Sequence, residues 1–133
     1  MGRQKHIVKA PDANWDDVDG DLRDAVVLAS MELRKTFYVS SGKRDDPGSA
    51  HDYGGAVDVS RINGTRFEDM NGTTARLLGN QVGATIVNFL PSGRGRELYT
   101  PGMAVRLDRF LSLASRKRLM ASHFNHVHAS VLP

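Results

Sequence analysis

A helix over residues 21–36 is the clearest element that the pattern of apolar and polar positions predicts. Its apolar residues recur at helical spacing, as one buried face requires: Leu22, Ala25, Val26, Ala29 and Leu33. Its last turn carries Arg34 and Lys35, and positive charge suits the carboxyl end of a helix. The acidic, turn-rich residues 11–21 are expected to form a loop that caps the amino end of this helix.

The same spacing predicts two later helices, separated by a loop. The first spans residues 73–90 and is interrupted by Gly79 and Gly83. Glycines and prolines then indicate a loop over residues 91–102. The last helix is predicted over residues 105–120, with one apolar face made of Leu107, Phe110, Leu111 and Ala114.

Three short segments have the composition or alternation of β-strands: residues 37–41, 56–60 and 125–131. Between the first two, residues 42–55 are rich in turn formers and polar groups, which predicts a loop. A mixed order of helices with few strands favours an α+β fold, a small, largely antiparallel sheet with helices packed on it. The chain of 133 residues and 14.6 kDa has room for one such domain, so a single domain over residues 1–133 is expected.

Composition removes several classes of chemistry. The chain has no cysteine, which excludes disulfides, thiolate zinc sites and a cysteine nucleophile. The net charge of +3 is a mild excess that suits an acidic polymer as partner, either nucleic acid or bacterial cell wall. On charge alone a nucleic-acid binder is the weakest alternative, and the alternation of glycine and arginine over residues 92–96 is interpreted as a flexible loop at the rim of a cleft. We therefore expect no nucleic-acid partner, and a monomer.

No targeting or membrane segment is expected. Residues 1–9 are charged, and no apolar stretch of signal-peptide length follows them. The longest apolar runs are far shorter than the roughly 20 residues that a membrane helix needs. If the protein acts outside a cell, this pattern favours release through a pore, as for a phage lysin, or a catalytic domain excised from a longer chain.

The placement of histidines is the main functional signal. Residues i and i+2 of a strand face the same side, so His126 and His128 are expected to project together while Val127 faces the core. Asp58 lies in the strand over 56–60, and the glycines just before that strand allow His51 to fold back over it. If the two strands are neighbours, His51, Asp58 and one C-terminal histidine converge on one point.

Two imidazoles and one carboxylate, without a thiol, are typical ligands of a catalytic zinc ion. Three protein ligands leave a fourth tetrahedral position for water, whose pKa zinc lowers to about 7. Hydrolysis at such a site also needs a general base and a cation for developing negative charge. The C-terminal cluster has spare imidazoles for the base, and Arg44 offers a guanidinium that grips carboxylates.

These residues resemble a known family. Ser-x-His-x-x-Gly-x-Ala-x-Asp, here Ser49 to Asp58, followed by a C-terminal His-x-His, is similar to the zinc peptidases of bacterial cell wall. That family includes D-alanyl-D-alanine carboxypeptidases, penicillin-insensitive murein endopeptidases and phage L-alanoyl-D-glutamate endolysins, which share the hedgehog/DD-peptidase fold. The segment from Val39 to Arg44 also resembles the family, and residues 123–128 look like the His-x-x-His-x-His variant of the murein endopeptidase branch.

The resemblance assigns a role to each residue. It implies one zinc ion bound by His51, Asp58 and His128. It further implies a catalytic set in which His126 and His123 are active-site imidazoles and Arg44 is the substrate anchor. Many relatives carry an acid three residues before the last zinc histidine, where this chain has Asn125. Either His126 is the base or hydrolysis is impaired.

We therefore expect a zinc metallopeptidase that hydrolyses peptidoglycan stem peptides or their cross-links, of carboxypeptidase or endopeptidase type. The alternative is a catalytically impaired, metal-containing module that binds peptide or cell wall.

Overall fold

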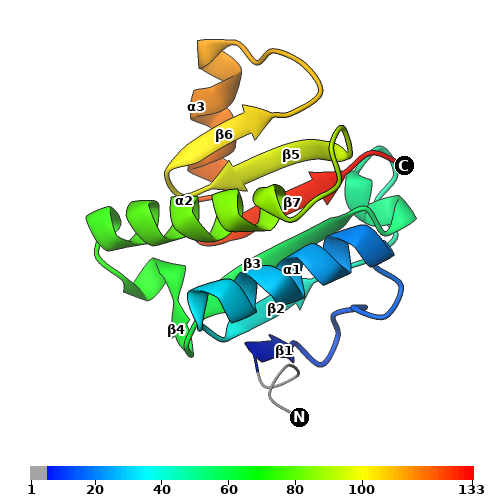
Figure 1. Ribbon diagram of the computed structural model, residues 1–133. Helices are drawn as coiled ribbons and strands as arrows, with labels where there is room; N and C mark the ends of the chain where they lie inside the picture. Colours follow the sequence, from blue (N-terminus) through cyan, green and yellow to red (C-terminus); the bar gives the residue numbers. More distant parts are fainter. Residues whose placement is uncertain (1–5) are drawn as a thin grey trace.

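Residues 6–133 are described by a computed structural model, and this part of the chain folds as an α+β domain (Figure 1). It holds three α-helices: α1 (Gly20–Leu33), α2 (Gly72–Asn88) and α3 (Leu113–Ser122). Seven strands form one sheet: β1 (Ile7–Lys9), β2 (Phe37–Ser41), β3 (Ala56–Ile62), β4 (Thr65–Arg66), β5 (Gly95–Thr100), β6 (Met103–Arg106) and β7 (Val127–Val131). The predicted α+β class is confirmed. Residues 1–5 of the charged start lie outside the described residues.

The sheet is antiparallel except at one edge. Its order is β1-β2-β3-β7-β5-β6, with β4 paired to β3, and only β1 and β2 run parallel. The first half of the chain supplies β1 to β4 and the second half β5 to β7. The C-terminal strand β7 lies between β3 and β5, so the centre of the sheet joins segments that are far apart in sequence.

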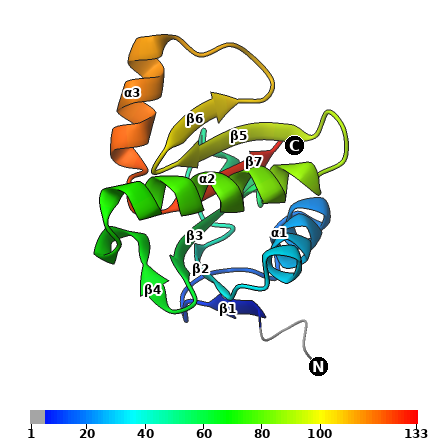
Figure 2. The ribbon, with the colours of Figure 1, turned by 60° about the vertical axis from the view of Figure 1, so that its left-hand side comes forward.

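The two faces of the sheet differ because side chains alternate along each strand. One face carries apolar residues into the core against α1 and α2, which lie on the same side of the sheet (Figure 2). Core residues of the central strands include Val57, Val59, Val127 and Ala129. The intervening residues, such as Asp58 and His128, point to the other face. This polar face is the floor on which the site described below is built.

The first helix begins and ends at identifiable caps. The Asp19 carboxylate accepts hydrogen bonds from the backbone N–H groups of Asp21 and Leu22, so the expected acidic cap is confirmed. The helix ends at Leu33, earlier than predicted, because Arg34 adopts a left-handed conformation with φ of 55°. Arg34 and Lys35 therefore lie beyond the last turn rather than in it.

The two glycines of α2 do not interrupt it. The helix is continuous over Gly72–Asn88, and both glycines face the β5–β6 hairpin. A Cβ at Gly79 would lie 2.7 Å from Cδ of Pro101, and one at Gly83 would lie 2.6 Å from Cδ1 of Leu98. The absence of side chains at these positions lets the helix pack closely on the hairpin, which the expectation of a broken helix missed.

Two expectations for the second half of the chain were wrong. The expected loop over residues 91–102 contains β5, an inner strand of the sheet. The glycines and prolines that flank this strand led to the prediction of a loop. The expected helix over residues 105–120 begins only at Leu113, where the Ser112 hydroxyl caps it, and β6 and an irregular segment precede it. The other predicted strands and the helix over 73–90 are confirmed with shifts of a few residues at their ends.

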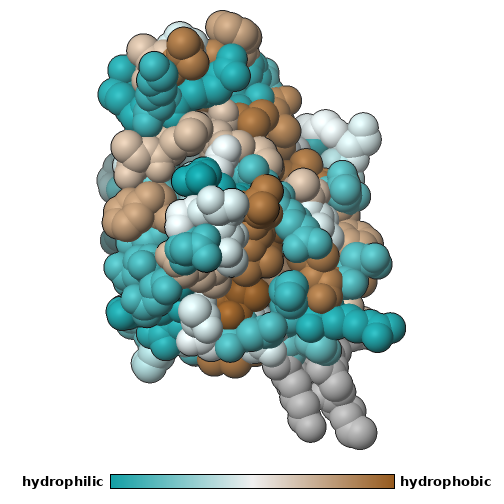
Figure 3. All heavy atoms as spheres, turned by 90° about the vertical axis from the view of Figure 1, so that its left-hand side faces the viewer, coloured by the Kyte–Doolittle hydropathy of each residue, from teal (hydrophilic) through white to brown (hydrophobic). Residues whose placement is uncertain are grey.

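The segment around α3 is a small lobe rather than part of the core. None of its helical residues is buried, and Phe110 and Leu113 are 83% and 65% exposed. Figure 3 shows hydrophobic residues at the surface over this lobe, at the top of the view, among hydrophilic ones. Among the described residues no helix has both the length and the apolar content to cross a membrane.

Candidate metal centre

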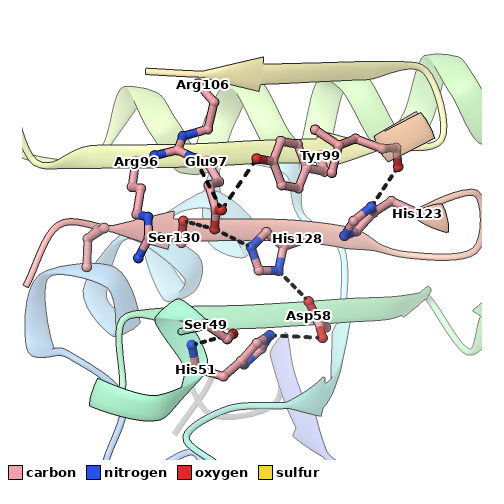
Figure 4. A network of polar contacts seen from close by, with 12 residues as sticks. Ser49, His51, Asp58, Arg96, Glu97, Tyr99, Arg106, His123, His128 and Ser130 are labelled. Carbon is pink, nitrogen blue, oxygen red and sulfur yellow. Dashed lines mark hydrogen bonds and ion pairs between the residues drawn. The ribbon is translucent and has the colours of Figure 1, made fainter. Parts of the chain in front are cut away.

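The register of the central strands brings the predicted ligands together. Asp58 of β3 is the direct partner of His128 of β7, and His128 is in turn paired with Tyr99 of β5. All three side chains project from the polar face of the sheet (Figure 4). The expectation that β3 and β7 are neighbours is confirmed.

His51 reaches this face from a short 3-10 helix, Ala50–Tyr53. The Ser49 hydroxyl caps that helix by accepting from the His51 N–H, and Gly54 ends it with φ of 78°. His51 Nδ1 lies 2.7 Å from the carbonyl oxygen of Gly42, which can only accept, so Nδ1 carries the hydrogen. The other ring nitrogen, Nε2, faces Asp58, 3.3 Å from its Oδ2 atom.

His128 lies between two carboxylates. Its Nδ1 is 2.9 Å from Oδ1 of Asp58, and its Nε2 is 2.9 Å from Oε1 of Glu97. The same Glu97 oxygen accepts a hydrogen bond from the Ser130 hydroxyl at 2.7 Å. Glu97 thereby fixes the orientation of the ring and leaves Nδ1 directed at the centre, the arrangement that metal-binding histidines commonly show.

These three residues can hold a metal ion. One ligand atom each from His51, Asp58 and His128 lies within 4.8 Å of the others, and all three residues are buried. Bond lengths of about 2.0–2.1 Å in a tetrahedron require ligand atoms about 3.3–3.4 Å apart. His128 lies 2.9 Å from Oδ1 of Asp58 and His51 lies 3.3 Å from Oδ2, and the three donor atoms are at most 4.8 Å apart, so the group closes on one ion when the side chains draw together.

The other predicted site residues line the same cavity, of about 550 Å³. His126 Nδ1 lies 2.8 Å from Oδ1 of Asn125, an acceptor, so the free Nε2 faces the centre, 3.8 Å from Oδ1 of Asp58. His123 Nδ1 is likewise held by the Leu119 carbonyl oxygen at 2.6 Å. Arg44 Nη1 lies 3.7 Å from Oδ2 of Asp58.

Arg44 is held at this position by two further contacts. Its Nη1 donates to the Ser41 hydroxyl at 2.6 Å, and its Nη2 lies 3.4 Å from Oδ2 of Asp46. The side chain is 48% exposed, so a molecule in the cavity can reach the guanidinium. The structure thus brings all six predicted site residues to one cavity: Arg44, His51, Asp58, His123, His126 and His128.

The mutual proximity of these groups shifts their pKa values in opposite directions. Burial alone would raise the pKa of Asp58, but hydrogen bonds and charge from His128 and His51 hold it well below its usual range. Burial also opposes ionisation of Glu97, yet His128 and Ser130 lower its pKa to about 2. For His128, the two carboxylates outweigh burial and raise the pKa to about 9. Burial lowers the pKa of His126 to about 4, which leaves it neutral at pH 7.

Two residues of the cavity, Glu97 and Tyr99, were missed by the sequence analysis. Both lie in β5, in the segment expected to be a loop. The Tyr99 ring stacks on His128 with centroids 5.4 Å apart and also contacts His123 at 4.9 Å. The signal that could have found them is the alternation around Leu98, which is buried in the core while Glu97 and Tyr99 face the other way.

The arginines of residues 92–96 are structural rather than a free basic loop. Arg94 forms ion pairs with Asp19 at 3.0 Å and Asp21 at 2.6 Å, and it also donates to the Leu132 carbonyl oxygen. Arg96 donates to the hydroxyl of Tyr53 at 2.9 Å. The interpretation of this segment as a flexible rim was wrong, because these contacts tie it to the start of α1 and to the C-terminal strand.

Metal binding is expected to release a proton from the site. Both nitrogens of His128 face carboxylate oxygens, which only accept, so the metal-free ring carries two hydrogens. A metal ion must displace the one on Nδ1. We expect release of about one proton per ion at pH 7, and affinity that rises about tenfold per pH unit up to the His128 pKa of about 9. Calorimetry in buffers of different ionisation enthalpy measures this, and a pH-independent affinity would contradict it.

Comparisons with known proteins do not add a second line of evidence: no family model, curated protein or solved structure matches this chain. The functional interpretation therefore depends on the chemistry of the site itself.

Proposed function

We propose that this protein is a zinc-dependent peptidase that hydrolyses peptidoglycan stem peptides or their cross-links, with a domain of the hedgehog/DD-peptidase type. The observation that carries the proposal is the arrangement of one open cavity. A His-Asp-His group that fits one metal ion lies on its floor, and further imidazoles and a guanidinium face the same point. Hydrolysis of an amide requires each of these functions.

The donor set favours zinc among common metals. Two imidazoles and one carboxylate, with no thiolate, suit a borderline ion, and three protein ligands are the usual number at a catalytic zinc site. A zinc ion held there supplies a Lewis acid for a substrate carbonyl and lowers the pKa of a coordinated water. Glu97, through its hydrogen bond to Nε2 of His128, keeps the other ring nitrogen available to the ion.

His126 is the proposed general base. Asn125 accepts the Nδ1 hydrogen of the ring, so the Nε2 lone pair faces the centre. An imidazole in this orientation takes a proton from the attacking water and returns it to the leaving amine. The presence of Asn125 where relatives carry an acid then has a physical explanation. An amide cannot act as the base, but its oxygen can orient His126, which does.

His123 and Arg44 are proposed to bind negative charge. The His123 ring packs against Tyr99 and His126, with its Nδ1 anchored on the chain at Leu119. Arg44 lies at the other side of Asp58 and is half exposed. Groups fixed in advance around the reacting carbonyl stabilise the oxyanion without reorganisation. Arg44 is also suited to a substrate carboxylate, which its planar fork binds through two hydrogen bonds.

The peptidoglycan assignment is supported by the resemblance of the Ser49–Asp58 and His123–His128 segments to cell-wall peptidases, and by the net positive charge of the chain. The alternative, a metal-containing module that binds peptide without cleaving it, is favoured by Asn125 in place of an acid and by the engagement of Arg44 with Asp46.

Digestion of purified peptidoglycan distinguishes the two. We expect soluble peptide fragments with new amino groups to appear with the zinc-loaded protein, to disappear on removal of the metal, and to return when zinc is restored. Chromatography of the fragments by mass identifies the cleaved bond. Retention of the protein on the cell wall without any zinc-dependent release of fragments would establish the binding module and overturn the peptidase.

A further inference from the structure

A second cavity of about 420 Å³ adjoins the metal cavity. His126 lines both cavities. The floor of the second cavity is the polar face of β2 and β3, with the hydroxyls of Ser40 and Ser60 and the side chains of Tyr38 and Arg61. It lies further along β3 from Asp58, away from Glu97 and Tyr99, which line only the first cavity.

A β-bulge places Arg61 in this cavity. Tyr38 of β2 pairs with Arg61 of β3, but the next residue of β2, Val39, pairs with Val59, so Ser60 is the extra residue. Without this insertion the alternation of β3 would send Arg61 to the face opposite Asp58. With it, the Arg61 guanidinium lies over the Tyr38 ring, 4.2 Å from the centroid.

Of the two arginines that line this cavity, Arg61 is the one without an ion pair to a carboxylate of the described residues. Arg66, which also lines it, pairs with Glu68 at 3.4 Å and with Asp69 at 3.0 Å. Within residues 6–133 no carboxylate lies within ion-pair distance of Arg61. A guanidinium stacked on an aromatic ring still has its in-plane N–H donors for an acceptor.

Two acids also line the cavity: Glu68, which pairs with Arg66, and Asp12, which is more hydrated than Arg61. Asp12 is exposed, whereas Arg61 is partly buried against Tyr38. Charges that are partly removed from water interact more strongly and are screened less by salt. The cavity should therefore bind an anionic group beside Arg61. A carboxylate is the anion that a planar guanidinium binds through paired hydrogen bonds.

We propose that this second cavity is a substrate subsite for a carboxylate-bearing residue, and that the protein is an endopeptidase. The inference rests on the proposed function. A carboxypeptidase needs the cleft closed beyond the residue it removes. Here the two cavities meet at His126, the one with Tyr99 on one side and the one with Arg61 on the other, so a peptide bound at His126 has room beyond the cleaved bond in both directions. The substrate is then a peptide that extends past the cleaved bond in both directions.

The test uses the full chain and two ligands, a cross-linked stem-peptide dimer and a stem-peptide monomer, each with free carboxylates or as carboxamides. Binding is measured by calorimetry with metal-free protein, and hydrolysis with zinc-loaded protein. The variants are Arg61→Gln and Arg61→Lys. The matched control is Arg66→Gln, which removes the same charge from a side chain that already pairs with Glu68 and Asp69.

We expect Arg61→Gln to weaken binding of the carboxylate dimer about 10- to 100-fold, and to act on KM rather than kcat, since a hydrogen-bonded charge is lost. Arg61→Lys should fall between wild type and Arg61→Gln, Arg66→Gln should stay within about threefold of wild type, and zinc affinity should not change in any of them. Amidation of the dimer should weaken wild-type binding by at least as much as Arg61→Gln does, and should have a smaller effect on that variant than on the wild type.

Equal losses for Arg61→Gln and Arg66→Gln, or a monomer bound and cleaved as well as the dimer, would overturn the subsite. The failure of the proposed function is a different result. In that case Arg61→Gln weakens dimer binding as expected, yet the zinc-loaded wild-type protein releases no new amino groups from any ligand.

Discussion

Alanine in place of His51 or His128 should abolish tight zinc binding, with affinity reduced on the order of 1,000-fold or more, because each removes one of three protein ligands. Glu97→Gln should lower zinc affinity about 10- to 100-fold, since Glu97 orients His128 and is not itself a ligand. Competition with a chromophoric chelator measures these affinities, and circular dichroism checks that each variant is folded.

His126→Ala is the matched control for those variants. It removes an imidazole from the same cavity, but one that the proposal places beside the ion rather than on it. We expect zinc affinity close to that of the wild type and a loss of kcat of about 100- to 10,000-fold, the usual contribution of a general base. If His126→Ala lost zinc as readily as His51→Ala, the division of roles among the imidazoles would be wrong.

Gly54→Ala should lower the free energy of unfolding by about 2–4 kcal/mol, for two reasons that add. Gly54 has φ of 78°, a conformation that L side chains rarely adopt, and a Cβ there would lie 2.4 Å from the backbone oxygen of Asp17. Gly54 also joins the helix that carries His51 to the strand that carries Asp58, and its carbonyl oxygen accepts from the Asp19 N–H at 2.7 Å.

Gly48→Ala separates the two causes. Gly48 has φ of 86°, so it bears the same conformational cost, but nothing lies within 4 Å of its Cβ position. We expect a loss of only about 1 kcal/mol there. Urea denaturation of the metal-free protein measures both variants. Equal losses would show that backbone conformation alone, without the contact to Asp17, determines the cost.

Local rules found most of the candidate site from the sequence. Alternation along a strand placed Asp58 on one face, and glycines allowed His51 to return over it. His126 and His128 line one cavity as expected, although β7 begins only at Val127 and His126 precedes it. The pairing of β3 with β7 was a hypothesis that residue spacing could not settle, because contacts between distant strands are set by the whole sheet. The structure confirms it.

The errors share a physical cause. Strand β5 lies among glycines and prolines whose local preference indicates a loop, but its place between β6 and β7 provides hydrogen bonds on both sides. Because this strand was predicted as a loop, Glu97 and Tyr99 were not predicted as site residues. The glycines of α2 were interpreted from backbone preference, whereas close packing on Leu98 and Pro101 determines them. In each case tertiary contacts outweighed local propensity.

X-ray absorption spectroscopy of the zinc-loaded protein reports the number, type and distance of the ligands around the ion. We expect one ion per chain, with four nitrogen or oxygen ligands at about 2.0–2.1 Å, two of them imidazoles, and one position that added azide or phosphonate can occupy. An ion surrounded by three or four imidazoles, or a protein that takes up no zinc at neutral pH, would contradict it.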